Sequence, residues 1–586
     1  MTAATDYPTP GTGLVQRPPR CAEGEGALLV VVDGSGPYWE RAIVDETVLR
    51  ALAHFGLPYR CLDLAAEPLG DEALRGCAAV VLAQNGLGDA VGDDGARRLA
   101  VAVQAGTGLI NLDYDLRRYS PALHEIFGFE GISPYPYATN RVRVRDADHY
   151  ITGLQEDGEL HELDRMVTAI AVESWRDDVT PLADGLLGRD QLVHIRHLVP
   201  HSAFEPRNYP LLFAARWGAG KAVQFALNQR VWRRAFYGHG RAMDDLFWRS
   251  LVWAARKPLV ANMVPPLVAL SIDDCRGRYD FGYVDVALEH GYVPIPSLFL
   301  DRVPERLFGK IREGRGSGQV EYGTHGMDYY DLLVYDFGVG ELDGDLLAQR
   351  FAVDDQWWAA LGARPGRTAR FHWGEYGVRA LPYLKERGYQ YFCPALQTGL
   401  HKADMCMDDG FWPYDLQNCY YDYLPDDHHF MGFGAMPPRG QEDFLTGHTP
   451  YLRERDHTDV EGAAASAAQR IRHGLRTGFH AELITHEQKF DALSLAEWDG
   501  ILRRAGEMTR GMERRHAGHD EVGDYYRAVD SAWIAAASAT DGQVRCRLEG
   551  NPASPLQVSL FRDEGDDVSR EYIEVPAFAG ETTVEI

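Results

Sequence analysis

The sequence lacks long apolar runs and blocks of basic residues. None of its apolar stretches approaches the roughly 18 residues that a membrane-spanning helix needs. Acidic residues outnumber basic ones by 86 to 59 in a chain of 586 residues, which gives a net charge of −27. A protein this acidic is poorly suited to hold a phosphate backbone or an anionic membrane surface. We therefore expect neither nucleic acid nor a membrane among its partners.

Cysteine is scarce and scattered as well. The eight cysteines include no CxxC pair, which argues against a disulfide framework and against a cysteine-based zinc site. Residues 1–26 contain four prolines and lack both the basic start and the apolar core of a secretory signal. We interpret this segment as a disordered lead-in and expect a cytoplasmic protein.

The composition is otherwise that of a packed globular protein. The hydrophobic fraction is 45% and the aromatic fraction is 11%. At about 150 residues per domain, the length predicts roughly three to four domains. Changes in the strand and helix pattern place the boundaries after residues 26, 257 and 511, so the predicted domains cover 27–257, 258–511 and 512–586.

The first predicted domain alternates strands with helices. Apolar strand-like runs lie at 27–32, 59–62, 78–83 and 109–112, and amphipathic stretches separate them. This alternation predicts a doubly wound parallel sheet with helices on both faces. The domain closes with a hairpin-like pair at 211–217 and 221–226 and a helix at 241–256. Its layout resembles the class I glutamine-amidotransferase-like (flavodoxin-like) domains.

Catalysis by such a domain would need a cysteine on a sharp strand-to-helix turn. Cys21, Cys61 and Cys77 do not stand in a Gly-x-Cys-x-Gly sequence. We therefore expect this domain to be non-catalytic, and its missing cysteine counts against the alternative that it performs the chemistry.

The second predicted domain, 258–511, repeats the strand-then-helix pattern. Its apolar runs end at Asp273, Leu300, Gly323, His372, Pro394 and His486. Helical patterns are clearest at 378–387, 460–475 and 495–508. This arrangement predicts a partly closed α/β barrel, whose active site would lie at the carboxyl ends of the strands. The last segment, 512–586, begins helical and then alternates in three short runs, which favours a small β-sandwich.

Two adjacent carboxylates, Asp273 and Asp274, follow the apolar run 267–272. Adjacent residues of a strand point to opposite sides, so the two acids can serve different tasks. One can bind a metal ion while the other accepts a proton from water. The alternative interpretation is a helix N-cap beside a solvated acid.

Other polar residues follow the ends of later predicted strands. They are His325, Arg370, His372 and His486. In an α/β barrel such residues converge on one mouth. A carboxylate and imidazoles can hold a divalent ion, and the remaining groups can accept and donate protons.

These residues, in this order, resemble the motifs of polysaccharide deacetylases of the NodB-homology type. The similarity covers 267–486. The stretch 271–275 (Ser-Ile-Asp-Asp-Cys) is similar to the family's opening Thr/Ser-Phe-Asp-Asp-Gly motif, and 321–325 (Glu-Tyr-Gly-Thr-His) to the start of its second motif. The stretch 370–374 is similar to the Arg-x-Pro-x-Gly motif with His372 at the proline position, and 483–486 to the closing Leu-x-His strand.

The resemblance implies a role for each residue. Asp273 would be the catalytic base, and Asp274 and His325 would bind a divalent metal ion, with zinc as the first choice. His486 would be the general acid. Arg370 would orient Asp273.

The third metal ligand is left open by the sequence. Where the family motif has a second histidine, this chain has Tyr329. We favour Asp328 or His372 as the third ligand. His428 and His429, within the aromatic insert 396–451, are further candidates. His480 should lie about 20 Å from His486 along its strand and is expected to be structural.

Together these features predict a metal-dependent amidohydrolase that removes the N-acetyl group of an amino sugar, a sugar-bearing metabolite or a glycan. The expected partner is an N-acetylated sugar or glycan, and homo-oligomerisation is an open possibility. The alternative is a catalytically silent carbohydrate-binding protein that keeps the barrel and has lost the metal.

Overall fold

The computed structural model describes residues 26–187, 207–233, 235–336, 340–372, 377, 379–393, 421–424, 427–433, 443–449, 458–540 and 543–586. The chain divides into two compact units. Unit 1 contains Pro265–Leu475 and Phe479–Tyr526, and unit 2 contains the described residues up to Val264 together with Arg476–Gly478 and Arg527–Ile586. The four-part division expected from the sequence stays a prediction. Nearly all of the segment expected to be a disordered lead-in, and most of the aromatic insert, lie outside the described residues.

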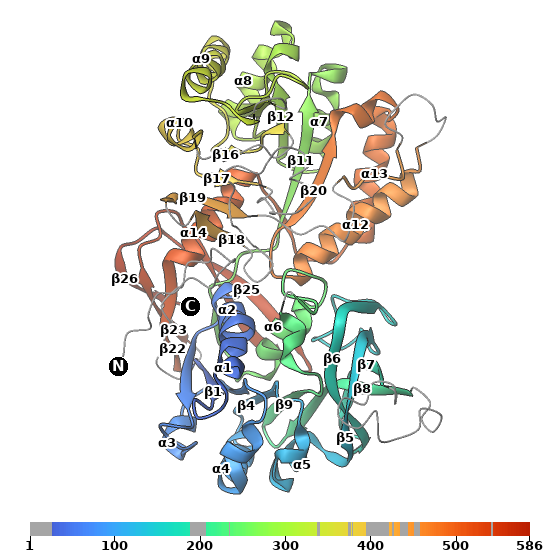
Figure 1. The fold of residues 1–586 in the computed structure, drawn as a ribbon, viewed down its shortest axis with the longest axis vertical. Helices are drawn as coiled ribbons and strands as arrows, with labels where there is room; N and C mark the ends of the chain where they lie inside the picture. The colour runs from blue at the N-terminus through green and yellow to red at the C-terminus, as the bar shows by residue number, and fades with distance from the viewer. Residues whose placement is uncertain are drawn as a thin grey trace. The chain divides into compact units, whose positions relative to one another are not determined.

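Unit 2 is built on a nine-stranded mixed sheet with the strand order β2-β1-β3-β4-β9-β8-β7-β5-β6. The strands from β2 to β9 in this order are parallel, and β8, β7, β5 and β6 add antiparallel pairs. Figure 1 shows this sheet in blue to green. Its strands are β1 Leu28–Val32, β2 Tyr59–Asp63, β3 Ala79–Leu82, β4 Gly108–Asn111, β5 Phe129–Val144, β6 Leu160–Trp175, β7 Thr180–Leu187, β8 Arg207–Trp217 and β9 Gly220–Phe225.

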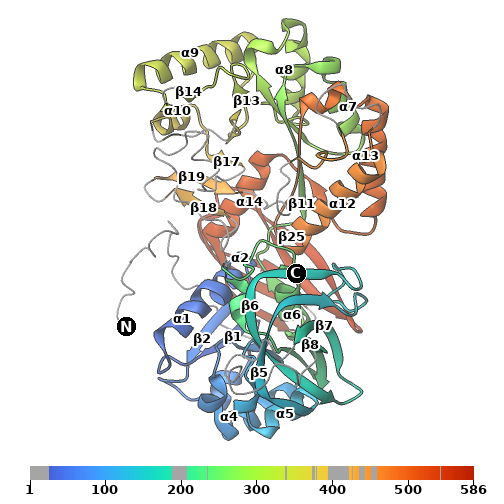
Figure 2. The ribbon, with the colours of Figure 1, turned by 45° about the vertical axis from the view of Figure 1, so that its right-hand side comes forward.

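Alternate residues of the parallel strands feed two separate cores. In β1, Leu28, Val30 and Val32 join one core, and Leu29 and Val31 join the other. The first core includes side chains of α1 (Tyr38–Val44), α2 (Arg50–His54) and α6 (Asp244–Ala254). The second includes side chains of α4 (Leu87–Gln104) and α5 (Pro121–Phe127), which lie together in Figures 1 and 2. The sheet is therefore covered by helices on both faces, as the continuous apolar strands predict.

Two three-stranded sheets complete unit 2. One has the order β22-β23-β26 and the other β10-β24-β25. Side chains from both sheets share one hydrophobic core. The strands are β10 Leu259–Ala261, β22 Ala532–Thr540, β23 Gln543–Gly550, β24 Leu556–Glu564, β25 Asp567–Val575 and β26 Gly580–Glu585.

Unit 1 contains a parallel sheet with the order β13-β12-β11-β20, in which β21 (Arg515–His516) also pairs with β11. The strands are β11 Leu267–Cys275, β12 Pro294–Phe299, β13 Gly323–Gly326 and β20 Ala481–His486. A second sheet has the order β16-β17-β19-β18, from Thr368–Ala369, Tyr391–Phe392, Asp427–Phe433 and Tyr421–Leu424. Figure 1 shows β11, β12 and β20 side by side. The prediction of mixed α/β structure is thus confirmed, whereas barrel closure stays a prediction.

Helices of unit 1 begin and end where local chemistry favours it. Helix α13 (Leu495–Met508) begins with a capping box between Ser494 and Glu497, and α9 (Gly344–Leu361) is capped by Asp343 and ends at Gly362 with φ of 77°. The other helices that begin in unit 1 are α7 Gly282–Glu289, α8 Phe308–Ser317, α10 Leu381–Glu386, α12 Val460–Arg476 and α14 His519–Ser531, and the last residues of α12 and α14 are assigned to unit 2.

Two faces of the β11–β20 pair differ in polarity. Leu270, Ile272 and Leu483 belong to the hydrophobic core of unit 1. On the opposite face, Asp273 lies directly beside His486 in the parallel register. Because side chains alternate along a strand, residues two positions before Asp273 and two positions before His486 lie on the same face as these two residues.

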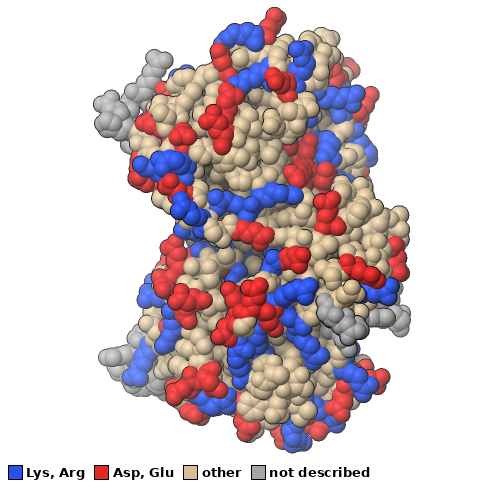
Figure 3. Space-filling view, turned by 180° about the vertical axis from the view of Figure 1, so that it is seen from behind, with Lys and Arg blue, Asp and Glu red and all other residues tan. Residues whose placement is uncertain are grey.

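No helix in the described ranges is long and apolar enough to cross a membrane. On the face that Figure 3 shows, Lys and Arg side chains are interspersed with Asp and Glu. The excess of acidic residues is thus not separated from the basic ones on this face.

Candidate metal centre

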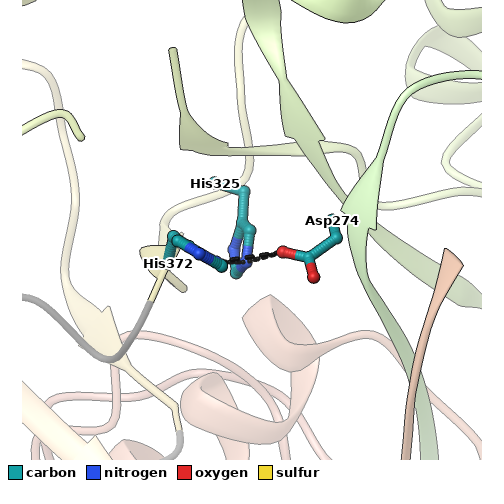
Figure 4. A group of neighbouring side chains, drawn as sticks. All are labelled: Asp274, His325 and His372. Carbon is teal, nitrogen blue, oxygen red and sulfur yellow. Dashed lines mark hydrogen bonds and ion pairs between the residues drawn. The ribbon is translucent and has the colours of Figure 1, made fainter. Parts of the chain in front are cut away.

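Three side chains from separate strand ends converge in unit 1. Asp274 lies near the end of β11, His325 lies in β13, and His372 follows β16 by three residues. All three are at least 95% buried, with exposures of 2%, 3% and 5%. Figure 4 shows the carboxylate and the two imidazole rings directed toward one point.

The distances between the three donor atoms suit one metal ion. Asp274 Oδ1 lies 3.1 Å from His325 Nε2 and 2.9 Å from His372 Nδ1, and the two nitrogens are 3.1 Å apart. A tetrahedral zinc ion with bonds of about 2.0–2.1 Å separates its ligand atoms by about 3.3 Å. Three protein ligands of this kind leave a position for water or substrate, which is the pattern of catalytic zinc sites.

The protonation of His325 supports the same conclusion. Its Nδ1 lies 2.6 Å from the carbonyl oxygen of Arg370. Because a carbonyl oxygen only accepts, Nδ1 carries the proton, and a neutral His325 presents the lone pair of Nε2 to the Asp274 carboxylate. Two acceptors face each other stably only if the ring gains a second proton or a cation lies between them. The residues present therefore fit a divalent ion.

Asp274 reaches this position through an uncommon backbone conformation. Its φ is 60°, in the left-handed region, and the pairing of β11 with β12 shifts register between Ile272 and Cys275. Its second oxygen accepts a hydrogen bond from Gln488. Burial raises the pKa of the Asp274 carboxyl, but the hydrogen bonds and positive charge that His325 and His372 supply when protonated outweigh burial and hold the pKa far below its usual range. The carboxylate is therefore ionised and available as a ligand.

Asp273 forms a buried two-bond pair with Arg370. The Arg370 Nε and Nη2 atoms donate to its two oxygens at 2.6 and 3.0 Å. Burial raises the pKa of Asp273, but the charge of Arg370 and its hydrogen bonds to the carboxylate lower the pKa below the usual value. Asp273 is thus an oriented, ionised carboxylate, which is the form that a general base requires.

His486 is held by a carboxylate that the sequence analysis missed. Its Nδ1 lies 2.9 Å from Asp443 Oδ2. Burial lowers the pKa of His486, but the hydrogen bond to Asp443 and the charges of nearby aspartates raise it to about 9. The imidazole is therefore protonated near neutral pH and can donate a proton from Nε2.

The structure does not bring Asp328 into the metal group. Its carboxylate pairs with Arg302, with one bond of 2.9 Å, and accepts from the Tyr329 backbone N–H at 2.7 Å. His429 lies 2.8 Å from the Tyr389 carbonyl oxygen, and the His428 ring lies 5.5 Å from the Tyr423 ring in a tilted arrangement. Of the sequence candidates for the third ligand, His372 alone stands in the described metal-binding groups. Trp373 and Gly374 of the expected arginine motif lie outside the described residues.

Two further residues support the site from the segment after β20. Gln488 bonds Asp274, and the buried carboxylate of Glu487 accepts from the backbone N–H groups of residues 276–278 and from the Tyr283 hydroxyl. Glu487 thereby fixes the turn that follows the two aspartates. Glu487 and Gln488 directly follow the end of β20, and this position was a usable sequence signal. Asp443 lies in the long insert, where no such signal marks it.

Comparisons with known proteins place the chain in no family. Neither the models of protein families nor the curated proteins give a match to this sequence. Solved structures similar to parts of the chain include a polysaccharide deacetylase from Mycobacterium smegmatis, with 13% identity, coverage of 46% of this chain and 96% of that chain, and a TM-score of 0.31. A ThuA-like protein from Bacteroides uniformis ATCC 8492 has 10% identity, coverage of 41% and 95%, and a TM-score of 0.28. A β-galactosidase from Bacillus circulans sp. alkalophilus has 14% identity, coverage of 35% and 29%, and a TM-score of 0.23. Likenesses this remote carry no argument about function, which rests on the site itself.

Proposed function

We propose that the protein is a metal-dependent amidohydrolase that removes an acyl group, acetyl in the first instance, from an N-acylated amino sugar or a glycan that contains one. The observation that carries the proposal is the arrangement of three groups around one point. A three-ligand metal site, an ionised carboxylate paired with arginine, and a protonated histidine paired with aspartate lie at neighbouring strand ends.

Asp274, His325 and His372 would hold the ion, which supplies a Lewis acid that polarises the acyl carbonyl and lowers the pKa of water. Asp273 accepts a proton from the attacking water while the water oxygen forms a bond to the carbonyl carbon. Arg370 keeps both oxygens of Asp273 in place. His486 donates its proton to the departing nitrogen as the C–N bond breaks, which yields a carboxylic acid and an amine.

The two pKa shifts match these roles. A base that starts ionised and an acid that starts protonated do not need to exchange protons with solvent before the reaction. Asp273, with a lowered pKa, and His486, with a pKa raised to about 9, are in those forms across the neutral range. Hydrolysis of an acyl amide follows from the general chemistry of these side chains. The choice of a sugar as substrate rests on the resemblance of the sequence motifs to those of polysaccharide deacetylases.

The test is acetate release from a panel of N-acetylated sugars and oligosaccharides by the zinc-loaded chain. Activity on at least one amide, abolished by a chelator and by Asp273→Asn, supports the proposal. Binding of a sugar without acetate release, by a chain that purifies free of metal and does not take up zinc, would instead identify a silent carbohydrate-binding protein.

A further inference from the structure

A second group of potential ligands lies in unit 1, apart from the centre described above. Cys393 follows β17, His480 precedes β20, Glu482 lies within β20, and His519 begins α14. His480 and His519 have no exposed surface, Cys393 is 1% exposed, and the Glu482 side chain is 11% exposed. One donor atom each from Cys393, His480 and Glu482 lies within 4.8 Å of the others.

The distances within this group approach those of a tetrahedral metal site. Glu482 Oε2 lies 3.5 Å from His480 Nε2 and 2.9 Å from His519 Nε2, and Cys393 Sγ lies 3.7 Å from His519 Nε2. For zinc, bonds of about 2.0–2.1 Å to nitrogen or oxygen and about 2.3 Å to sulfur predict separations of about 3.3 Å and about 3.6 Å. Cys393, His480 and Glu482 therefore form a group of potential ligands whose donor atoms lie within 4.8 Å of one another, and His519 contacts two of its members, Glu482 and Cys393.

Hydrogen bonding within the protein accounts for His519, whose Nε2 bonds Glu482 at 2.9 Å, but not for His480 Nε2. His480 Nδ1 bonds the Tyr526 hydroxyl at 3.0 Å, while His480 Nε2 is fully buried, lies 3.5 Å from Glu482 Oε2 and forms no hydrogen bond with any described residue. A buried polar atom without a partner is costly, and here it is directed at a carboxylate and a thiol. The Tyr526 hydroxyl occupies the position of the outer partner that commonly orients a metal-binding histidine. Ser271, which donates to Glu482 Oε1 at 2.6 Å, orients the carboxylate in the same way.

We propose that Cys393, His480, Glu482 and His519 bind a second divalent metal ion, zinc by the nature of the ligands, in a closed site with four protein ligands. A thiolate with two imidazoles favours zinc over the oxygen-seeking magnesium and calcium ions. Four protein ligands leave no position for water, so this ion is structural and joins β17, β20 and α14. The absence of a CxxC pair hid the site in the sequence, because its ligands come from three separate segments.

Arg370 contacts residues of both the first and the second centre. Arg370 Nη1 is 3.9 Å from Glu482 and 3.5 Å from the carbonyl oxygen of Cys393, while the same guanidinium holds Asp273. An ion bound at the second centre fixes Cys393 and Glu482, and these two residues contact the Arg370 guanidinium at Nη1. The second ion thus supports the position of the general base without contacting substrate.

The test counts metal ions and identifies their ligands in the full-length protein. Zinc-loaded, dialysed protein should contain two zinc ions per chain by elemental analysis, Asp274→Asn should contain one, and Cys393→Ser should contain one. In the cobalt-substituted protein, a thiolate-to-cobalt charge-transfer absorption should be present in the native chain and in Asp274→Asn. It should be absent in Cys393→Ser and unchanged in Cys546→Ser, a matched loss of a buried thiol in β23.

The second centre and the proposed activity fail separately in this design. A native chain that binds one zinc ion, lost in Asp274→Asn, would overturn the second centre and leave the first intact. If Cys393→Ser does not fold, X-ray absorption of the native zinc protein decides the matter. It should detect a sulfur ligand at about 2.3 Å, and zinc bound by nitrogen and oxygen alone would overturn the proposal.

Discussion

The backbone carbonyl of Arg370 accepts a hydrogen bond from Nδ1 of His325 at 2.6 Å, while the Arg370 side chain holds both oxygens of Asp273. One residue therefore orients a metal ligand with its main chain and the proposed base with its side chain. Substituting the side chain leaves the carbonyl in place, so the two functions can be separated by experiment.

We expect Arg370→Lys to keep the metal and lose turnover by up to about 10². Lysine keeps a positive charge but cannot form two parallel bonds to a carboxylate, so Asp273 loses its fixed orientation. Zinc content and kcat, measured on the same preparation, check this. Loss of zinc together with activity would show that the side chain also maintains the metal centre.

We expect Asp274→Asn to abolish binding at the first metal centre. Asparagine tolerates the left-handed backbone that position 274 adopts, so the substitution removes the charge without straining the turn. Elemental analysis and competition with a zinc chelator measure the loss. The control is Asp328→Asn, which removes a carboxylate that pairs with Arg302 instead, and which should keep its zinc.

Asp273→Asn should retain zinc and lower kcat by about 10² or more, because the amide cannot accept the proton from water. Steady-state acetate release is the measurement. Turnover close to that of the native protein would remove Asp273 from the proposed mechanism.

His486→Ala should fold, keep its metal and lose turnover severely on an amide. The loss should be much smaller on an ester of the same acyl group, because an alcohol leaves with less help from an acid than an amine does. Both substrates are assayed side by side. Equal losses on the two substrates would assign His486 a structural role.

Asp443→Asn should lower the pKa of His486, because the carboxylate that stabilises its protonated form is gone. In the native fold this pKa is raised from 6.5 to about 9. The stabilisation that protonated His486 contributes is therefore complete below pH 6.5 and is lost as the pH rises toward 9. In the variant the imidazole should lose its proton at lower pH, and the alkaline limb of kcat/KM should move down with it.

The histidine titration can be followed by NMR in the metal-free native and variant proteins, and kcat/KM in the zinc-loaded forms. Thr485→Val is the matched control, since the Thr485 hydroxyl donates to the same Asp443 oxygen at 3.3 Å without carrying charge. An unchanged pKa in Asp443→Asn would show that Asp273 and Asp274 set the protonation of His486.

Local sequence signals predicted the elements that bear the site. The apolar runs before Asp273 and His486 correspond to β11 and β20, and the expected helix 495–508 matches α13. The sequence did not predict β5 as a strand, because Pro134 and Pro136 interrupt it; the structure accommodates them through register shifts in its pairing with β6. The predicted strand ending at Gly323 instead begins there, as β13.

Site residues that end an apolar run were predicted from the sequence. Site residues that reach the centre only through the folding of a distant segment were missed. Asp328 and His372 were equal candidates for the third ligand. Asp328 is close to His325 in the sequence, whereas His372 follows the end of another predicted strand. The structure brings His372 to Asp274 at 2.9 Å. Asp443 could not be found, because its contact with His486 spans 43 residues of chain without a periodic pattern.

The parallel register of β11 and β20 has a consequence for any attempt to redesign this protein. Asp273 and His486 are direct partners in the ladder, so main-chain spacing of about 4.8 Å fixes how far apart their side chains begin. Lengthening either side chain by one methylene group, as in Asp273→Glu, moves a functional group while its partner stays in place. Under the proposed function, reactivity toward a bulkier acyl group is therefore better sought in residues outside this acid–base pair.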